Sequence, residues 1–227
     1  VLRDSNRIIT VSPGFESLLN NRFSIKSKSI IIYNGFDNDD FKNVFSKRGN
    51  KDKIIISHTG SLSRSQNPVG LFQSIKNHNQ GDKKTKIKLQ LVGSIHPFII
   101  DTIKKLNIQK YVDILPYQSH KKIIQILLDS DYIFLVIPDL EKNEGIIPGK
   151  LFEYFNSHTE ILLLGNRDSD AATLAKEMGY QNIYEIKESI NFIDLKLNQN
   201  LNKDALFKFE RKYLTASLAK VFDGINA

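Results

Sequence analysis

The chain has 227 residues, of which 41% are hydrophobic and 25% charged, so it can bury one full core with a small second part. This composition excludes collagen-like, mucin-like and wholly disordered chains, and the absence of cysteine excludes disulfide scaffolds, thiolate zinc sites, iron–sulfur clusters and cysteine nucleophiles. The net charge of +7 is compatible with phosphate-bearing partners such as nucleotides.

The N-terminal segment predicts a strand, a helix and a second strand. Residues 7–12 form a β-branched run, and Ser12 followed by Pro13 is typical of a helix start. A second apolar run, from residue 29, stops at the turn signal Asn34-Gly35. The polar stretch that follows leads us to expect a domain boundary near residue 50.

The rest of the chain alternates strands and helices with short connections. Most of its strands are nearly continuous apolar runs, which is typical of a parallel sheet covered on both faces. The sequence therefore predicts a doubly wound, mainly parallel α/β sheet, Rossmann-like in class. Strands are expected at 53–60, 88–93, 111–116, 131–138, 160–166 and near 183–184. Helices are expected from Pro68, Pro97, His120 and Pro148, from Asp170 as a cap, and over 203–222.

The common strand order for such a sheet is 3-2-1-4-5-6, in which chain progression reverses between strands 1 and 4. Ligands bind beyond the carboxyl ends of the strands at that reversal. The order places the strands at 54–59 and 132–137 side by side. The candidate binding loops are then 59–68 and 138–150.

Both loops carry chemistry suited to phosphate. The helix expected from Pro148 would offer free amides and a partial positive charge, with Gly149 and Lys150 in its first turn. Lys150 and Glu153 lie three residues apart, so they share a helix face; taken alone, this spacing favours an ordinary surface ion pair over a binding site.

The other loop has Gly60, where backbone can approach a phosphate closely, followed by Ser61 and Arg64. It matches neither the GxxxxGK[ST] nor the GxGxxG pattern, which disfavours a P-loop ATPase and a dehydrogenase.

Several segments, in order and spacing, resemble retaining glycosyltransferases of the family-4 type, which have the two-domain GT-B architecture. The resemblance covers nearly the whole chain and is closest to the C-terminal, nucleotide-sugar-binding half. The segments are DSNRIITVS, IIYNGFDNDDF, HTGSLSRSQNP, LQLVGS, ILPYQSHKKIIQILLDSDYIFLVI, GIIPGKLFEYFNS and FERKYLTASLAKVF.

The resemblance implies site residues. Glu153 matches the second glutamate of the family's paired motif, which accepts hydrogen bonds from the ribose. The amides of residues 147–150 match the segment near the diphosphate, and Gly60 with Ser61 matches the turn that closes on the donor phosphates. Tyr117 matches the region that contacts the base.

Two departures from the family pattern stand out. The first motif glutamate falls at Gly145, with Glu144 adjacent, which puts its contact with the sugar in doubt. The expected basic pair near the glycine turn is absent, leaving Arg64 and Lys150 as the candidate phosphate cations.

Other patterns favour structural roles. The pairs Asp129/Asp131 and Asp168/Asp170 mimic a metal-binding DxD motif but flank helix ends, so we expect neither a metal nor a cofactor. We expect His120 to be a surface residue and His58 a packed strand residue. No basic stripe interleaved with aromatic residues indicates nucleic-acid binding.

The resemblance implies a glycosyltransferase that moves a sugar from a nucleotide-diphosphate donor to a saccharide or lipid-linked acceptor, without metal, in surface polysaccharide synthesis. The rivals are a nucleotide-sugar 2-epimerase and a non-catalytic nucleotide-sugar-binding module. Residues 1–50 would be a remnant of the acceptor-side domain with the linker, and 51–227 the donor domain.

The localisation expected from the sequence is cytoplasmic. The chain has no apolar run long enough to cross a membrane and no recognisable export signal. Because it begins at Val1 and its only methionine is Met178, we expect a piece of a longer protein, inactive by itself. In the full-length form, a lipid-linked acceptor would bring peripheral contact with the inner membrane face.

Overall fold

The computed structural model describes residues 2, 4–47, 52–81, 84–195 and 201–225. The strands are β1 (Ile8–Thr10), β2 (Ser29–Ile31), β3 (Lys53–Thr59), β4 (Lys86–Val92), β5 (Val112–Leu115), β6 (Tyr132–Val136), β7 (Glu160–Leu164) and β8 (Ile183–Tyr184). The α-helices are α1 (Pro13–Phe23), α2 (Val69–Gln80), α3 (Pro97–Lys105), α4 (His120–Asp129), α5 (Lys150–Ser157), α6 (Asp170–Glu177) and α7 (Arg211–Asp223). Short 3₁₀ helices are η1 (Asn38–Phe41), η2 (Arg64–Gln66), η3 (Gln109–Tyr111) and η4 (Lys203–Phe209).

Six parallel strands form the main sheet, in the order β5-β4-β3-β6-β7-β8. The expected order and the reversal of chain progression are confirmed, since β3 lies between β4 and β6. In the pairing of β3 with β6, Ile56 is opposite Tyr132 and Ser57 is opposite Ile133. The carboxyl ends of β3 and β6 are therefore neighbours, as the switch-point argument requires.

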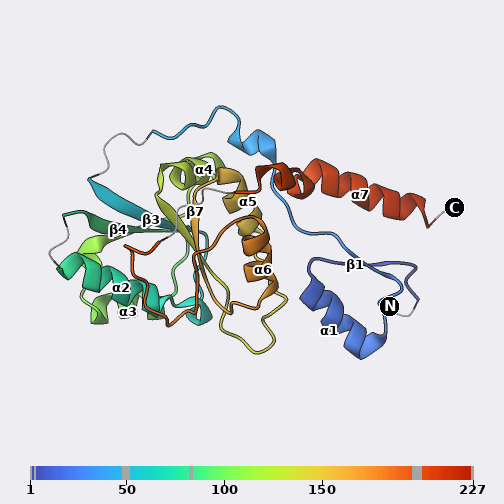
Figure 1. The fold of residues 1–227 in the computed structure, drawn as a ribbon, viewed down its shortest axis with the longest axis horizontal. Helices are drawn as coiled ribbons and strands as arrows, with labels where there is room; N and C mark the ends of the chain where they lie inside the picture. Colours follow the sequence, from blue (N-terminus) through green and yellow to red (C-terminus); the bar gives the residue numbers. More distant parts are fainter. Residues whose placement is uncertain (1, 3, 48–51, 82–83, 196–200, 226–227) are drawn as a thin grey trace.

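Helices cover both faces of this sheet (Figure 1). Alternate residues of β6 point to opposite faces: Ile133 and Leu135 pack into the core under α4, α5 and α6, while Phe134 and Val136 pack into the core under α2 and α3. Two buried faces explain why the strands are continuously apolar rather than alternating. In the described part of the chain, the two cores bury both faces of the sheet, and the pockets at its strand ends remain open to ligands.

The N-terminal segment forms a small unit beside the main sheet, with β1 and β2 paired in parallel and α1 next to them (Figure 1). The predicted start of α1 is confirmed, because the Ser12 side chain accepts a hydrogen bond from the Phe15 amide and Pro13 opens the helix. The Gly14 amide donates to the Asp170 carboxylate at 2.6 Å. This contact joins α1 to the main domain.

The linker between the two parts packs along α4 and α5. Phe36 and Val44 are buried in the same core as α4, α5 and α6, so this stretch is part of the main hydrophobic core. The boundary expected near residue 50 falls within 48–51, outside the described residues.

Two helix starts differ from the sequence prediction. α5 begins at Lys150 rather than Pro148, because the Pro148 carbonyl accepts from the Leu151 amide in a tighter first turn. The cap of α6 is Ser169 rather than Asp170, since the Ser169 hydroxyl accepts from the Ala172 amide.

The predicted terminal helix over 203–222 is two elements, η4 and α7. It breaks at Glu210, which adopts extended backbone and forms a bridge with Phe36. The Arg211 amide donates to the Phe36 carbonyl at 2.9 Å, so a long-range backbone pair replaces helix continuity. α7 then runs toward the N-terminal unit (Figure 1). None of the helices in the described part of the chain combines the length and hydrophobicity needed to cross a bilayer.

Candidate functional site

A pocket of about 210 Å³ opens at the carboxyl ends of β3 and β4, beside the switch point. It brings together four of the residues expected from the sequence, Gly60, Tyr117, Lys150 and Glu153. The full lining is Thr59, Gly60, Val92, Gly93, Tyr117, Gln118, His120, Ile123, Lys150 and Glu153. We refer to it below as the switch-point pocket.

Two glycines shape the floor of this pocket. Gly60 and Gly93 follow β3 and β4 with φ values of +99° and +127°, a region that side-chain-bearing residues rarely adopt. The Gly60 amide donates to the Val92 carbonyl at 2.7 Å, and a Cβ on Gly93 would lie 2.5 Å from the Gly60 carbonyl oxygen. A Cβ on Gly60 would lie 2.9 Å from Lys150 Nζ. The positive φ, more than this contact with the end of a flexible side chain, favours glycine at position 60.

Helix α5 is fastened to the end of β3 by two side chains. Lys150 Nζ donates to the Thr59 carbonyl oxygen at 2.8 Å. The Tyr154 hydroxyl lies 3.1 Å from the Thr59 hydroxyl, and burial raises the pKa of Tyr154 to about 12, so it stays protonated. Because residues i and i+4 share a helix face, both reach the same strand end.

His58 supports Lys150 from inside the sheet. The ring is fully buried, as expected for a packed strand residue, and its Nδ1 lies 3.0 Å from the Phe134 carbonyl oxygen, which can only accept. Nδ1 therefore carries the proton, and Nε2 offers a lone pair to Lys150 Nζ at 3.4 Å. Burial, and secondly the Lys150 charge, lower the pKa of His58 to about 3, while backbone hydrogen bonds oppose this weakly. The ring stays neutral.

Lys150 is a mostly buried cation held by neutral acceptors. Burial lowers the pKa of Lys150 to about 8, against a smaller raising effect of the Glu153 charge. Within the described ranges, no carboxylate forms an ion pair with Lys150 Nζ. A buried ammonium that lacks a counterion is stabilised by an arriving anion.

The Glu153 carboxylate is held by a residue that the sequence did not single out for the site. Glu153 Oε1 lies 3.3 Å from His120 Nε2, at the start of α4. His120 Nδ1 faces Asp40 Oδ1 of η1 at 3.6 Å. The His120 side chain is 46% exposed, in keeping with a surface residue, yet it also lines the pocket. Asp40, His120 and Glu153 are far apart in the sequence, so no local pattern indicated their contact.

Four further residues expected from the sequence lie outside the pocket lining: Ser61, Arg64, Gly145 and Gly149. Ser61 and Gly149 are chain neighbours of lining residues, and a Cβ on Gly149 would meet nothing within 4 Å. Arg64 lies in η2, and its guanidinium packs 5.0 Å from the centroid of the Phe98 ring. Of the two cations expected to bind phosphate, Lys150 lines this pocket and Arg64 does not.

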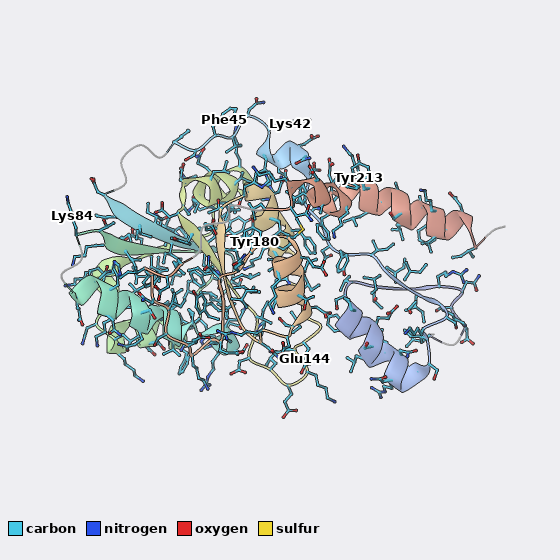
Figure 2. The ribbon with its side chains drawn as sticks, viewed as in Figure 1. Lys42, Phe45, Lys84, Glu144, Tyr180 and Tyr213 are labelled. Atoms are coloured by element: carbon cyan, nitrogen blue, oxygen red, sulfur yellow. The ribbon has the colours of Figure 1, made fainter. Side chains whose placement is uncertain are left out.

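Gly145 stands where the resemblance leads us to expect the first motif glutamate. The space that a side chain would need at this position is occupied by the backbone of α1. A Cβ there would lie 2.8 Å from the Phe15 amide nitrogen, and the Ser12 hydroxyl donates to the Gly145 carbonyl at 2.6 Å. A glutamate cannot occupy this position unless α1 moves. Neighbouring Glu144 is exposed on the loop beside α1 (Figure 2) and does not line the pocket.

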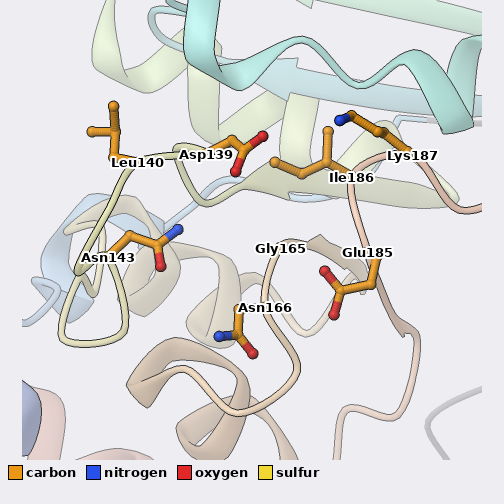
Figure 3. Close-up of a pocket in the computed structure, with 8 residues that line it drawn as sticks. All are labelled: Asp139, Leu140, Asn143, Gly165, Asn166, Glu185, Ile186 and Lys187. Atoms are coloured by element: carbon orange, nitrogen blue, oxygen red, sulfur yellow. The ribbon is translucent and has the colours of Figure 1, made fainter.

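A second cavity, of about 470 Å³, lies at the carboxyl ends of β6, β7 and β8 (Figure 3). Asp139, Glu185 and Lys187 bring two carboxylates and one amine to its wall, and all three are exposed. This wall is less suited to a diphosphate than that of the switch-point pocket, because it carries a net negative charge.

Three of the four aspartates in the pairs that mimic a metal motif accept hydrogen bonds from backbone amides. Asp129 accepts from the Lys47 amide at 2.7 Å and Asp131 from the Ile55 amide at 2.7 Å. Asp170 holds the Gly14 amide. In the part of the chain that the structure describes, no three His, Asp or Glu side chains are grouped to hold a metal ion.

No family model matches the chain, and no curated protein matches it significantly. Solved structures do. HepE from Anabaena, in complex with UDP and glucose, has a TM-score of 0.74 at 14% identity and covers 98% of this chain and 64% of its own. Sucrose-phosphate synthase from Thermosynechococcus elongatus has a TM-score of 0.73 at 12% identity, covering 99% and 59%. A glycosyltransferase from Rickettsia africae has a TM-score of 0.70 at 16% identity, covering 97% and 63%.

The chain thus spans between 59% and 64% of the length of these three proteins. At such identities the likeness establishes the fold. It confirms the class expected from the sequence: the chain has a doubly wound, mainly parallel α/β fold, which it shares with these three structures.

Proposed function

We propose that the chain is the donor-binding part of a glycosyltransferase and binds a nucleotide-diphosphate sugar in the switch-point pocket. The observation that carries this proposal is Lys150, a mostly buried ammonium over the Gly60 turn that forms no ion pair with a described carboxylate. UDP bound to HepE, a protein of the same fold, supports a uridine nucleotide as the first candidate.

In this proposal, the diphosphate, the ribose and the base of the donor each have a partner at the pocket. Lys150 and the first amides of α5 bind the diphosphate, since a helix N-terminus adds its own partial charge to that of the side chain. Glu153 accepts hydrogen bonds from the ribose hydroxyls, and Tyr117 lies against the base. Tyr117 is 87% exposed, so it has a ring face to offer.

Transfer follows the family-4, retaining type and needs no metal. Lys150 and the α5 amides stabilise the charge that develops on the leaving diphosphate, the role that a metal ion plays elsewhere. The acceptor is a saccharide or a lipid-linked saccharide in surface polysaccharide synthesis. A lipid-linked acceptor would bring the whole protein to the inner face of a membrane.

One observation favours a second candidate, a binding module that does not transfer sugar. The position of the first motif glutamate is occupied by α1 backbone against Gly145, so the family's usual carboxylate contact to the sugar has no counterpart there. Binding and transfer are therefore tested separately.

Titration calorimetry with a panel of nucleoside diphosphates, with and without magnesium, tests the proposal. We expect one of them to bind independently of magnesium. Lys150→Met removes the charge but keeps a buried aliphatic side chain, and it should abolish most of that binding. Lys122→Ala, at an exposed lysine of α4 outside the pocket, is the matched control. No binding by the wild type rejects the nucleotide site, and strict dependence on magnesium rejects the metal-free mechanism.

Turnover of a nucleotide sugar by a longer protein that contains this chain separates the two candidates. Release of nucleoside diphosphate only in the presence of an acceptor supports transfer. Tight binding of the nucleotide sugar without any release supports the binding module.

A further inference from the structure

A line of three side chains connects the linker to the wall of the switch-point pocket. Asp40 lies in η1, His120 is the first residue of α4, and Glu153 is on α5. His120 Nε2 is 3.3 Å from Glu153 Oε1, and His120 Nδ1 is 3.6 Å from Asp40 Oδ1. The imidazole therefore stands between two carboxylates that come from separate elements.

The chemistry of the ring explains what this arrangement can hold. Carboxylate oxygens only accept hydrogen bonds, and a neutral imidazole has one N–H, so it can serve only one of the two. A ring that serves both carries both ring protons and is a cation. With a proton on Nε2, in the cation or in that neutral tautomer, His120 donates to Glu153 Oε1 and leaves Oε2 to accept from a ligand.

The linker around Asp40 is fixed by contacts with the same two helices. Asn156 of α5 donates to Asn38 at 3.2 Å, and Gln125 of α4 donates to the carbonyl of Phe45 at 2.9 Å. Phe45 marks the place of this stretch above α4 in Figure 2. The position of Asp40 relative to His120 is thus set by the packing of the linker as well as by the contact between the two side chains.

Lys150 and Glu153 are three residues apart on one helix, a spacing at which opposite charges readily pair. In the described part of the chain they form no ion pair: the lysine donates to the Thr59 carbonyl, and the glutamate lies against His120. If the two paired, each would block the other from a ligand. His120 keeps the carboxylate away from the ammonium.

We propose that His120 is a positioning residue, which holds the Glu153 carboxylate in the orientation that accepts hydrogen bonds from a ribose diol, and that Asp40 orients His120. This inference rests on the proposed nucleotide site. It adds to that site a residue on α4 and a residue on the linker, neither of which needs to touch the nucleotide.

The readout is the preference for ribose over deoxyribose. The nucleoside diphosphate that binds the wild type most tightly and its 2′-deoxy analogue are titrated into the wild type and each variant. Loss of a hydrogen bond to a charged group weakens binding by about tenfold or more, so the wild type should prefer the ribonucleotide by that factor. A merely structural role of His120 would weaken both ligands alike.

Three variants test the line of contacts. We expect His120→Ala to reduce the ribose preference by about three- to tenfold, because a carboxylate that is no longer held loses part of the hydrogen bond to the ribose. Asp40→Asn should reduce it by about two- to threefold. Asp39→Asn is the matched control, because Asp39 lies in the same turn but pairs with Lys42, and it should leave the preference unchanged.

The outcomes separate this inference from the proposed function. If the wild type binds a nucleoside diphosphate with a ribose preference that His120→Ala retains, the positioning role is wrong and the nucleotide site stands. If His120→Ala removes the preference but Asp40→Asn does not, the contribution of Asp40 is rejected. If the wild type binds no nucleoside diphosphate, both the site and the positioning role fall. Unchanged circular dichroism confirms that each variant is folded.

Discussion

Two pockets lie at the same edge of the sheet, and they differ in how their charges are held. In the pocket at the ends of β6, β7 and β8, Asp139, Glu185 and Lys187 are exposed and are screened by water. In the smaller switch-point pocket, Lys150 is mostly buried and has a lowered pKa. A buried charge interacts far more strongly with a ligand than an exposed one, so size is the poorer guide to function.

The largest expected effect comes from removing the buried charge. Lys150→Met should weaken binding of a nucleoside diphosphate by about 2–5 kcal/mol, the range for losing one member of a buried charge pair. Binding of the matching nucleoside should change little, since it has no diphosphate. Calorimetry with both ligands measures the difference. Lys187→Met, in the other pocket, is the control; an equal loss in that variant would contradict the assignment of the site.

The lowered pKa of Lys150 also predicts how stability depends on pH. Because burial holds this pKa at about 8 in the folded chain against 10.5 in the unfolded chain, the unfolded chain binds more protons between these values. The contribution of Lys150 to the free energy of unfolding should therefore rise with pH from about 8 to 10.5, by at most about 3 kcal/mol.

Urea denaturation at several pH values measures this rise, and Lys150→Met should remove it. Lys187→Met should leave it intact. A wild-type curve that matches the Lys150→Met curve across this window would show that Lys150 is not buried in the folded chain.

A smaller effect is expected at Glu153, whose carboxylate we propose binds the ribose. Glu153→Gln should weaken nucleotide binding by about 1.5–3 kcal/mol, the scale of a hydrogen bond to a charged group, and leave the thermal midpoint nearly unchanged. The matched control in the exposed pocket is Glu185→Gln, which should alter neither quantity. If Glu153→Gln instead lowers stability and leaves affinity unchanged, Glu153 is an ordinary surface residue.

The smallest effect concerns Gly149, which adopts helical backbone with φ −55° and has open space where a Cβ would stand. Gly149→Ala should raise the free energy of unfolding by about 0.4–1 kcal/mol, because alanine restricts the unfolded chain. The same methyl group would stand where a diphosphate approaches the first amides of α5, so affinity should fall. Thermal denaturation and calorimetry on one sample measure both. A rise in stability with unchanged affinity would move the diphosphate away from these amides.

Much of the framework was predictable because local pattern encodes it. Continuous apolar runs identified strands buried on both faces, and their alternation with helices gave the order that places β3 beside β6. Ser12 and Pro13 marked the start of α1 because capping is a local interaction. The spacing of Lys150 and Glu153 likewise placed both on one helix face, and the strand order placed that helix near Gly60.

The rest depended on contacts between distant residues, for which no local pattern exists. His58 and Lys150 are 92 positions apart, and their contact follows from the way α5 docks on the end of β3. The break at Glu210 arises because backbone pairing with Phe36 replaces a continuous helix. The sequence by itself determined most of the elements and the strand order, and from that order it predicted the edge of the sheet at which a ligand would bind. Only the tertiary structure decided which side chains meet there, because burial and long-range packing set their neighbours, charges and orientation.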